Sequence, residues 1–402
     1  MQSIQTVSEN TIYVGASDRR LAKFENLFPI PRGVSYNAYV ILDEKTALLD
    51  TADASVGAQF LENVAAALDG RKLDYLIVDH MEPDHAAMIE AVLVRWPDLR
   101  LVVNAKTLPM LKMYFPTDGA AFDDALVVKE GDTLDLGKHK LTFVMAPMVH
   151  WPEVMMTYEK TTGTLFSADA FGIFGAHDGN IFADCYDFDR DWLPAARRYY
   201  TTIVGKFGKF TMGALKKASG LDIKMICPLH GYIIRKDFEK YLAAYTAWGT
   251  YTAEEQGVLV LYASPYGNTK NAAEILANEL AAKGVDKMKL IDVSHTDPMY
   301  ILPEVFRFSN LVIATTTYNG DMFIKMEEAL TELRSMGVSN KKVSIIQSGS
   351  WAPTAGKKVQ EMTDQLTGTE YVGDMVTIKG TVKEDSREAL VALADAIAES
   401  LK

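Results

Sequence analysis

Cysteine is almost absent from this sequence, which has only Cys185 and Cys227 among its 402 residues. Two cysteines cannot build a disulfide framework, and they are too few for a four-cysteine zinc or iron site. Cys227 lies in the apolar run IKMICPLH, which is typical of a thiol packed in a core. Disulfides therefore do not hold this chain together.

Long apolar runs and an excess of basic residues are also missing. No run reaches the roughly 18 to 20 residues that a membrane-spanning helix needs, and the start, MQSIQTVSEN, lacks the features of a signal peptide. The 41 basic and 53 acidic residues give a formal net charge of -12, which repels phosphate backbones and anionic membranes. We therefore expect a cytoplasmic globular protein that binds neither nucleic acid nor membrane.

The apolar pattern divides the chain into two halves. The first half has many short apolar runs separated by turn residues, including a hairpin predicted around residues 43–45 and a helix predicted over 85–95. The second half alternates strands and helices regularly, which predicts a doubly wound parallel sheet after an α/β sandwich. We place the boundary between residues 253 and 254.

The stretch VDHMEPDHAAMI concentrates metal-binding side chains directly after an apolar run. It contains His80, Glu82, Asp84 and His85, and a loop after a strand can direct several side chains at one volume. Three further candidates, His150, Asp169 and His230, each follow another apolar run. We expect all seven to meet where the strands end.

Two divalent cations would explain this combination of side chains. Without cations, two carboxylates about 4 Å apart repel by roughly 4 kcal/mol at an effective dielectric constant of about 20. If Asp169 bridges, the seven residues supply four ligand positions to each of two metals and leave room for substrate. The residues alone allow either hydrolysis or redox chemistry at such a site.

The second half contains a loop suited to a single phosphate. The segment YASPYGNTK joins an apolar strand to a helix, and it lacks both the dinucleotide fingerprint and the Walker lysine pattern. Two later loops, TTTYNGDMF and SGSWAPTAGKK, also follow strands, and they bring Tyr318 and Trp351, which can cover a planar ring. Pro265 removes one N-H donor from the first loop.

Together these motifs resemble those of the flavodiiron proteins, and the resemblance extends over the entire chain. It implies an N-terminal metallo-β-lactamase-like αββα sandwich at 1–253 and a C-terminal flavodoxin-like doubly wound parallel sheet at 254–402. It also implies two iron ions: one bound by His80, Glu82 and His150, the other by Asp84, His85 and His230, with Asp169 bridging.

The same resemblance implies that FMN is bound by the three loops of the second half. The implied binding residues are Ser264, Tyr266, Gly267, Asn268, Thr269, Thr315, Tyr318, Asn319, Gly320, Ser348, Gly349, Ser350 and Trp351. No catalytic residue beyond the metal ligands is expected. His177, in a glycine-rich aromatic loop, is a candidate for lining the metal pocket, with ordinary loop packing as the alternative.

By this resemblance the protein reduces O2 to water, NO to N2O, or both, with electrons that reach the metals through FMN. The expected donor is an external carrier such as rubredoxin, and the expected assembly is a head-to-tail homodimer or a dimer of such dimers. The alternative is a dizinc hydrolase with a regulatory flavodoxin-like half. Related zinc hydrolases carry a histidine in place of Glu82, and zinc has no redox chemistry that could use a flavin's electrons.

Overall fold

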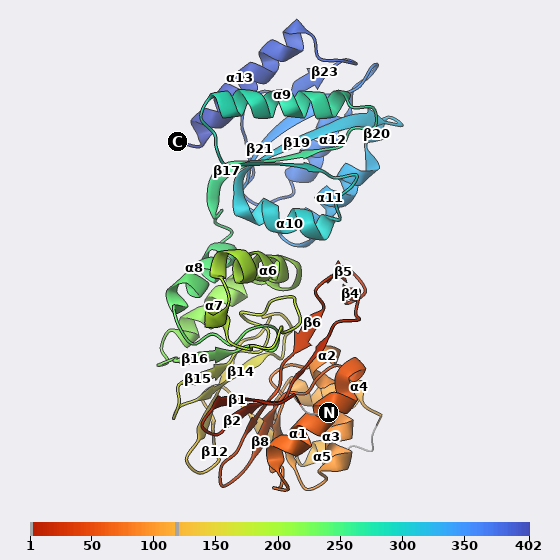
Figure 1. Ribbon diagram of the computed structural model, residues 1–402. Helices are drawn as coiled ribbons and strands as arrows, with labels where there is room; N and C mark the ends of the chain where they lie inside the picture. Colours follow the sequence, from red (N-terminus) through yellow and green to blue (C-terminus); the bar gives the residue numbers. More distant parts are fainter. Residues whose placement is uncertain (1–2, 117–119) are drawn as a thin grey trace. The chain divides into compact units, whose positions relative to one another are not determined.

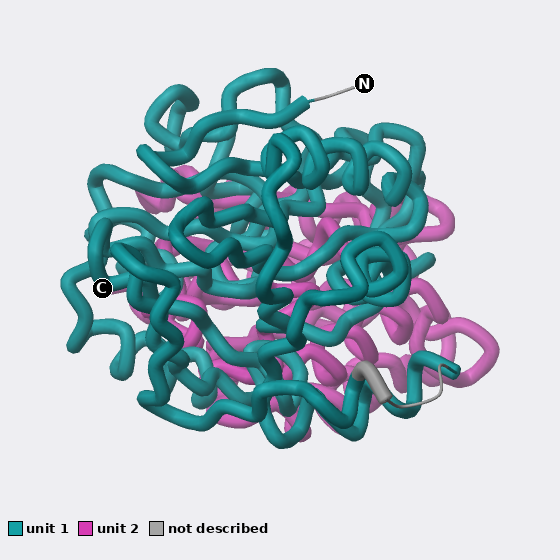
Figure 2. Tube along the Cα trace, turned by 90° about the horizontal axis from the view of Figure 1, so that it is seen from below, with its two compact units in different colours: residues 1–200, 209–245 teal, residues 201–208, 246–402 magenta. Residues whose placement is uncertain are grey.

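The computed structural model describes residues 3–116 and 120–402, which form two compact units (Figure 1). Unit 1 comprises Met1–Tyr200 and Lys209–Tyr245, and unit 2 comprises Thr201–Gly208 and Thr246–Lys402 (Figure 2). The domain boundary between residues 253 and 254 stays a prediction, because the two units do not divide the chain at a single residue.

Unit 1 contains a seven-stranded mixed sheet. Two of its strands, β7 and β8, consist of Tyr39 and aliphatic residues. Both are buried along their whole length, as expected for a sheet covered on both faces. β7 and β8 form the predicted hairpin. In spatial order the strands are β1 (Gln5–Ser8), β2 (Thr11–Tyr13), β7 (Tyr39–Ile41), β8 (Ala47–Leu49), β9 (Tyr75–Ile77), β10 (Arg100–Asn104) and β11 (Leu126–Val128).

A second, five-stranded sheet packs face to face with the first. Its strands follow one another in sequence order, and only the pairing of the last two is parallel. They are β12 (Thr133–Asp135), β13 (Lys140–Met145), β14 (Met155–Glu159), β15 (Thr164–Phe166) and β16 (Met225–Cys227). One buried core joins Ile77 and Val102 of the first sheet to Phe143 and Phe166 of the second.

Helices cover the outer faces of the two sheets. α1 contacts β7 and α4 contacts β10 on the first sheet, and α6 to α8 lie beside the second, which completes an αββα sandwich (Figure 1). The helices are α1 (Gly57–Leu68), α2 (Pro83–Ala86), α3 (Ile89–Arg95), α4 (Thr107–Tyr114), α5 (Ala120–Asp123), α6 (Leu193–Tyr199), α7 (Gly208–Ala218) and α8 (Phe238–Gly249).

Short irregular elements complete unit 1. Two small antiparallel pairs join β3 to β6 and β4 to β5. Single 3-10 or π turns precede or extend several of the helices. These elements are β3 (Ala16–Asp18), β4 (Lys23–Phe24), β5 (Phe28–Pro29), β6 (Val34–Tyr36), η1 (Ala54–Val56), η2 (Ala183–Cys185), η3 (Phe188–Trp192), η4 (Tyr200–Val204) and η5 (Gly205–Phe207); η4 after its first residue and all of η5 belong to unit 2.

Unit 2 is built on a parallel sheet whose spatial order is the doubly wound order 2-1-3-4-5. The crossovers between its strands are helices, as parallel pairing requires. The strands are β18 (Met288–Asp292), β17 (Glu255–Tyr262), β19 (Phe308–Tyr318) and β21 (Lys342–Ser348), with β22 (Glu370–Tyr371) and β23 (Val376–Ile378) both paired to β21, and β20 (Asp321–Met322) paired to β19.

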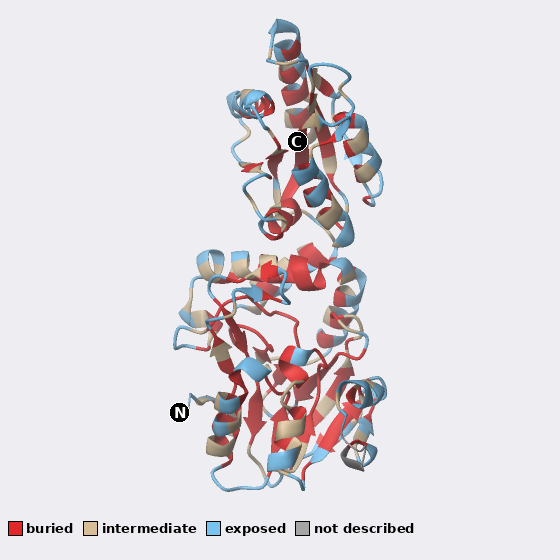
Figure 3. Cartoon of the chain, turned by 90° about the vertical axis from the view of Figure 1, so that its right-hand side faces the viewer, coloured by how far each residue is buried: buried red, intermediate tan, exposed pale blue. Residues whose placement is uncertain are grey.

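Helices lie on both faces of this sheet. α9 and α13 lie together on one face, where Leu276 and Leu393 join the strand residues Val260 and Val312 in one core (Figure 1). α10 and α11 contact each other, as do α11 and α12. The helices are α9 (Asn268–Ala282), α10 (Pro298–Arg307), α11 (Ile324–Ser335), α12 (Ala355–Thr363) and α13 (Glu384–Ser400). In both units the strands are largely buried and the helices expose one side (Figure 3).

The observed architecture confirms the predicted fold class and adds local details that the sequence analysis did not provide. The helix predicted over 85–95 is interrupted at Ala87 and Met88, between α2 and α3. The two-residue strands β20 and β22 were not predicted. His139 is buried beside Glu159, whose carboxylate it approaches to 3.4 Å. None of the described helices combines the length and the apolar character needed to cross a membrane.

Candidate functional site

The segment after β9 folds so that its polar side chains point inward. Pro83 occupies the first turn of α2, where its missing N-H group is not needed, and this single turn buries Asp84 and His85. The backbone before the turn is fixed by Asp50, whose Oδ1 atom accepts hydrogen bonds from the N-H groups of Asp79 and His80. A buried carboxylate thus holds the start of the loop.

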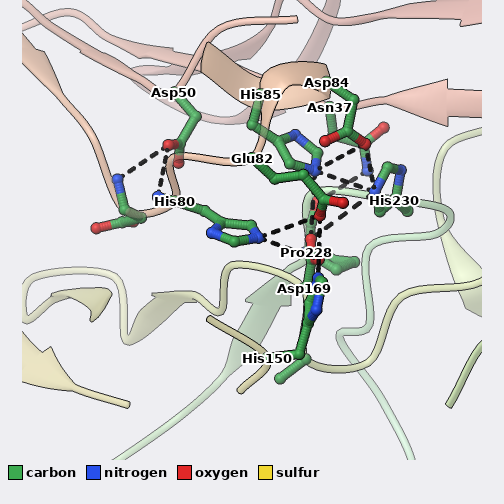
Figure 4. Close-up of polar contacts among 12 residues, drawn as sticks. Asn37, Asp50, His80, Glu82, Asp84, His85, His150, Asp169, Pro228 and His230 are labelled. Carbon is green, nitrogen blue, oxygen red and sulfur yellow. Dashed lines mark hydrogen bonds and ion pairs between the residues drawn. The ribbon is translucent and has the colours of Figure 1, made fainter. Parts of the chain in front are cut away.

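The remaining three candidates follow strands of the second sheet. His150 follows β13, Asp169 follows β15 and His230 follows β16. The structure brings all seven side chains together, each of them buried (Figure 4).

The seven side chains form two groups, and Asp169 faces both. The first group is His80, Glu82, His150 and Asp169, and the second is Asp84, His85 and His230. Oδ2 of Asp169 lies 3.2 Å from Nε2 of His150, and Oδ1 lies 3.3 Å from Nε2 of His85. One carboxylate therefore presents one oxygen to each group, which is the geometry of a bridging ligand.

Within each group the imidazole nitrogens and carboxylate oxygens point at a common centre (Figure 4). Oε2 of Glu82 lies 3.0 Å from Nε2 of His150 and 3.3 Å from Nε2 of His80. In the second group, Oδ2 of Asp84 lies 3.3 Å from Nε2 of both His85 and His230. These are the lone-pair atoms that bind metals in proteins.

The donor set fits cations because several of its buried atoms are otherwise unsatisfied. Both carboxylate oxygens of Asp84 and of Asp169 lack a well-aligned hydrogen bond within the described part of the chain, although imidazole nitrogens lie near them. Buried charges of this kind are costly unless they are paired or coordinate a metal. Two divalent ions would satisfy them.

The electrostatics of the cluster also favour bound positive charge. Burial alone would raise the pKa of Asp169, but its contacts with His150, His80 and His85 outweigh this effect and hold the pKa well below its usual range. Burial likewise opposes protonation of His150, yet the neighbouring Asp169 and Glu82 raise its pKa to about 9. A metal ion would therefore replace protons carried by the imidazoles.

Two acidic residues at the site gave no signal in the sequence. Glu153 accepts a hydrogen bond from Nδ1 of His80 at 2.8 Å. Glu25 follows β4, and desolvation together with a hydrogen bond to Glu82 raises its pKa to about 8. Each is a single carboxylate in an irregular segment, where neither periodicity nor spacing distinguishes it from a surface residue.

His177 reaches the cluster through Asn37. Its Nε2 atom lies 3.2 Å from Oδ1 of Asn37, and the amide of Asn37 donates to the carbonyl groups of Pro228 and Gly231, on either side of His230. The His177 ring packs edge-on against Tyr13. These contacts support packing behind the His230 loop, and a role for His177 as a pocket residue stays a prediction.

In unit 2 the three predicted loops border one pocket of about 620 Å³. The pocket is at the carboxyl ends of β17, β19 and β21 and at the first turn of α9. Its lining consists of Ser264, Pro265, Tyr266, Asn268, Thr269, Thr316, Thr317, Tyr318, Asn319, Gly320, Ser348, Gly349, Ser350, Trp351, Ala352, Thr354 and Gly380.

Two of the residues predicted for this pocket lie outside its lining. Gly267 precedes α9 with a φ of 90°, and Thr315 is fully buried in β19. The loops are tied together by a 2.7 Å hydrogen bond between the hydroxyl groups of Thr269 and Ser348. Gly380, which follows β23, is a lining residue that the three motifs did not include.

The pocket combines a polar end with exposed aromatic rings. The hydroxyl of Ser264 accepts a hydrogen bond from the N-H group of Lys270, close to the N-terminus of α9, where backbone N-H groups favour an anion. Tyr266 is 92% exposed and Trp351 83% exposed, so both rings have apolar faces that a planar ligand can cover.

Comparisons with known proteins agree with this division. Residues 34–231 match the family described as ODP family beta lactamase, and residues 260–392 match the flavodoxin family. An anaerobic nitric oxide reductase flavorubredoxin from Klebsiella pneumoniae is 31% identical over 367 residues, which are 90% of this chain and 74% of the relative.

Solved structures show the same likeness over nearly the whole chain. Rubredoxin oxygen:oxidoreductase from Desulfovibrio gigas has a TM-score of 0.90 and 26% identity, covering 99% of this chain and 98% of its own. The flavodiiron protein from Giardia intestinalis has a TM-score of 0.90 and 25% identity, covering 99% of this chain and 97% of its own.

Proposed function

The chain belongs to the flavodiiron protein family, and from this premise we propose that it is an oxidoreductase that reduces O2 to water, NO to N2O, or both. Relatives named for each activity occur among its matches, one a nitric oxide reductase and one an oxygen oxidoreductase. The observation that carries the proposal is the position of Asp169, with one oxygen toward each of two buried ligand groups.

We propose that the first group, His80, Glu82 and His150, holds one iron and that Asp84, His85 and His230 hold the other. Bound iron and FMN would supply the electron-transfer chemistry that amino-acid side chains lack. Glu82 supports iron over zinc, because harder oxygen ligands and higher coordination numbers suit iron better than a tetrahedral zinc site.

The side chains of this protein would prepare the site for that chemistry. The carboxylates of Asp169 and Glu82 offset metal charge, and the burial of the cluster limits the access of bulk water. In unit 2, Ser264, Asn268 and Thr269 would hold the FMN phosphate at the start of α9, while Tyr318 and Trp351 would cover the flavin ring.

The electron donor and the assembly are also part of the proposal. The name of the Desulfovibrio gigas relative supports a rubredoxin-like carrier as the donor. We further propose a cytoplasmic head-to-tail homodimer, or a dimer of such dimers, whose chains each comprise a metal domain at 1–253 and an FMN domain at 254–402.

Anaerobically purified protein provides the decisive experiment. We expect two irons and one FMN per chain, and consumption of O2 or NO, measured separately with the same reduced carrier, that depends on both cofactors. The faster of the two rates would identify the preferred substrate. Two zincs per chain with esterase activity and no gas consumption would contradict the proposal in favour of a hydrolase.

A further inference from the structure

Glu153 lies directly behind one of the proposed metal ligands. Its Oε1 atom is 2.8 Å from Nδ1 of His80, and the side chains of both residues are fully buried. The N-H group of Met81 donates to the same oxygen at 2.9 Å. With a proton on Nδ1 of His80, the Nε2 atom keeps its lone pair and faces Glu82 and Asp169.

The main-chain carbonyl group of Glu153 is held by the side chain of Asn104. The side-chain amide of Asn104 donates to the carbonyl oxygen of Glu153 at 2.5 Å. Oδ1 of Asn104 in turn accepts hydrogen bonds from the N-H groups of Lys106 and Thr107 at the start of α4. The carboxylate of Glu153 therefore has little freedom to leave His80.

In the second metal group, neither Nδ1 atom of the two histidines is hydrogen-bonded to a carboxylate of the described residues. Nδ1 of His230 is 2.8 Å from the carbonyl oxygen of Ser35, which carries no net charge. Nδ1 of His85 has no hydrogen-bond partner among the described residues. The two groups each have one terminal carboxylate ligand, Glu82 or Asp84, so what distinguishes the first group is a carboxylate, Glu153, hydrogen-bonded to one of its histidines.

When a carboxylate accepts a hydrogen bond from a metal-binding histidine, it fixes the tautomer of the histidine ring and raises the basicity of the ligating nitrogen. We propose that Glu153 is a positioning residue that orients His80 and makes the metal position of His80, Glu82 and His150 the tighter of the two. This inference rests on the proposed function, because it takes these residues as metal ligands.

Titration of metal-stripped full-length protein with Co2+, followed by visible absorption and calorimetry, tests the inference. We expect the wild-type protein to bind two ions in two steps of different affinity. Glu153→Gln keeps the size of the side chain but removes its charge, so the tighter step should weaken by about 10- to 100-fold. The weaker step should not change.

Glu159→Gln is the matched control. Glu159 is also a buried carboxylate beside a buried histidine, His139, and His139 is not a member of either metal group. We expect both Co2+ steps of this variant to match the wild type. Glu153→Asp keeps the charge on a shorter arm and should bind the tighter ion between wild type and Glu153→Gln, so it carries the test if the glutamine variant fails to fold.

A double variant separates positioning from a general loss of stability. In a His80→Ala background, Glu153→Gln should have no further effect on Co2+ affinity, since the partner it acts through is gone. Equal weakening of both steps by Glu153→Gln, or two equal steps in the wild type, would overturn this inference and leave the proposed function standing. Co2+ binding that is unchanged by His80→Ala would instead contradict the metal site itself.

Discussion

The Nε2 atoms of His85 and His230 lie 3.0 Å apart inside the proposed metal centre. Nδ1 of His230 donates to the carbonyl oxygen of Ser35 at 2.8 Å, which fixes the ring with Nε2 toward His85. Without a metal, a proton on one of the two Nε2 atoms keeps their lone pairs from facing each other. With a metal bound by both Nε2 atoms, that proton has to leave, which couples metal binding to proton release.

Removal of one of these two ligands should empty one metal position. We expect His85→Ala to retain about one of two metal ions and to lose gas-reducing activity on the order of 100-fold, because the loss of a ligand or of its supporting partner weakens metal sites strongly. Metal content by elemental analysis and gas consumption measure the two effects. His139→Ala also removes a buried histidine, and an equal loss of metal in that variant would contradict a specific role for His85.

His177 should make the protein sensitive to acid. Burial, and to a lesser degree the charge of Arg19, lowers the pKa of His177 to about 4, whereas an unfolded histidine has a pKa of about 6.5. Between these values the unfolded chain binds one more proton than the folded chain, so stability falls as the pH falls through this window. The expected slope is up to about 1.4 kcal/mol per pH unit.

Denaturant unfolding between pH 7 and pH 4 measures this dependence. His177→Asn removes the titrating ring, so it should flatten the slope relative to wild type. His295 is an exposed histidine in unit 2, with 82% of its side chain accessible, and His295→Asn should leave the slope unchanged. The same slope in wild type and His177→Asn would assign the acid sensitivity to other groups.

The exposed ring of Trp351 should contribute to flavin affinity. We expect Trp351→Ala to weaken FMN binding about tenfold, which corresponds to about 1.4 kcal/mol of lost ring contact. Fluorescence titration of the flavin-free protein with FMN measures the change. Tyr371 is 40% exposed in the same unit but does not line the pocket, so Tyr371→Ala is the control, and equal weakening in both variants would count against ring covering by Trp351.

Gly231 should tolerate no side chain next to His230. Its φ is 77°, and a Cβ atom at this position would lie 2.2 Å from Cγ1 of Ile173. Gly231→Ala should lower the free energy of unfolding by about 3 kcal/mol, through backbone strain and overpacking together. It should also weaken metal binding, because Gly231 follows His230 directly.

Gly70 separates the two causes. It has a similar φ of 80° but open space around the site of a Cβ atom, so Gly70→Ala should cost only about 1 kcal/mol from backbone strain. Chemical denaturation of both variants gives the comparison. A loss in Gly70→Ala as large as that in Gly231→Ala would show that contact with Ile173 contributes nothing.

The sequence predicted the elements whose signals are local. The apolar runs located the strands, and the positions of His150, Asp169 and His230 directly after such runs predicted that they would meet His80 and its neighbours. The regular alternation of strands and helices in the second half predicted the doubly wound parallel sheet of unit 2. These signals suffice because strand ends converge at one edge of a sheet.

The features that the sequence did not predict depend on partners far along the chain. His139 is buried because it meets Glu159 and Asn10, and no pattern around residue 139 indicates either contact. Glu153 is separated from His80 by 73 positions along the chain, and only the folded chain places the two side chains in contact. Pairings of this kind need the tertiary structure.

The proposed iron ligands follow successive strands in the sequence, beginning with four after β9. His230 comes last, after β16. During synthesis, a ribosome-bound chain that ends before residue 230 therefore lacks one ligand of the second metal position. Completion of the second position has to wait until β16 has joined β15, and a chain that stops before His230 has the full ligand set of the first position only. The flavin loops, from residue 264 onward, are made after this step, so the cell can load the metals before a flavin pocket exists.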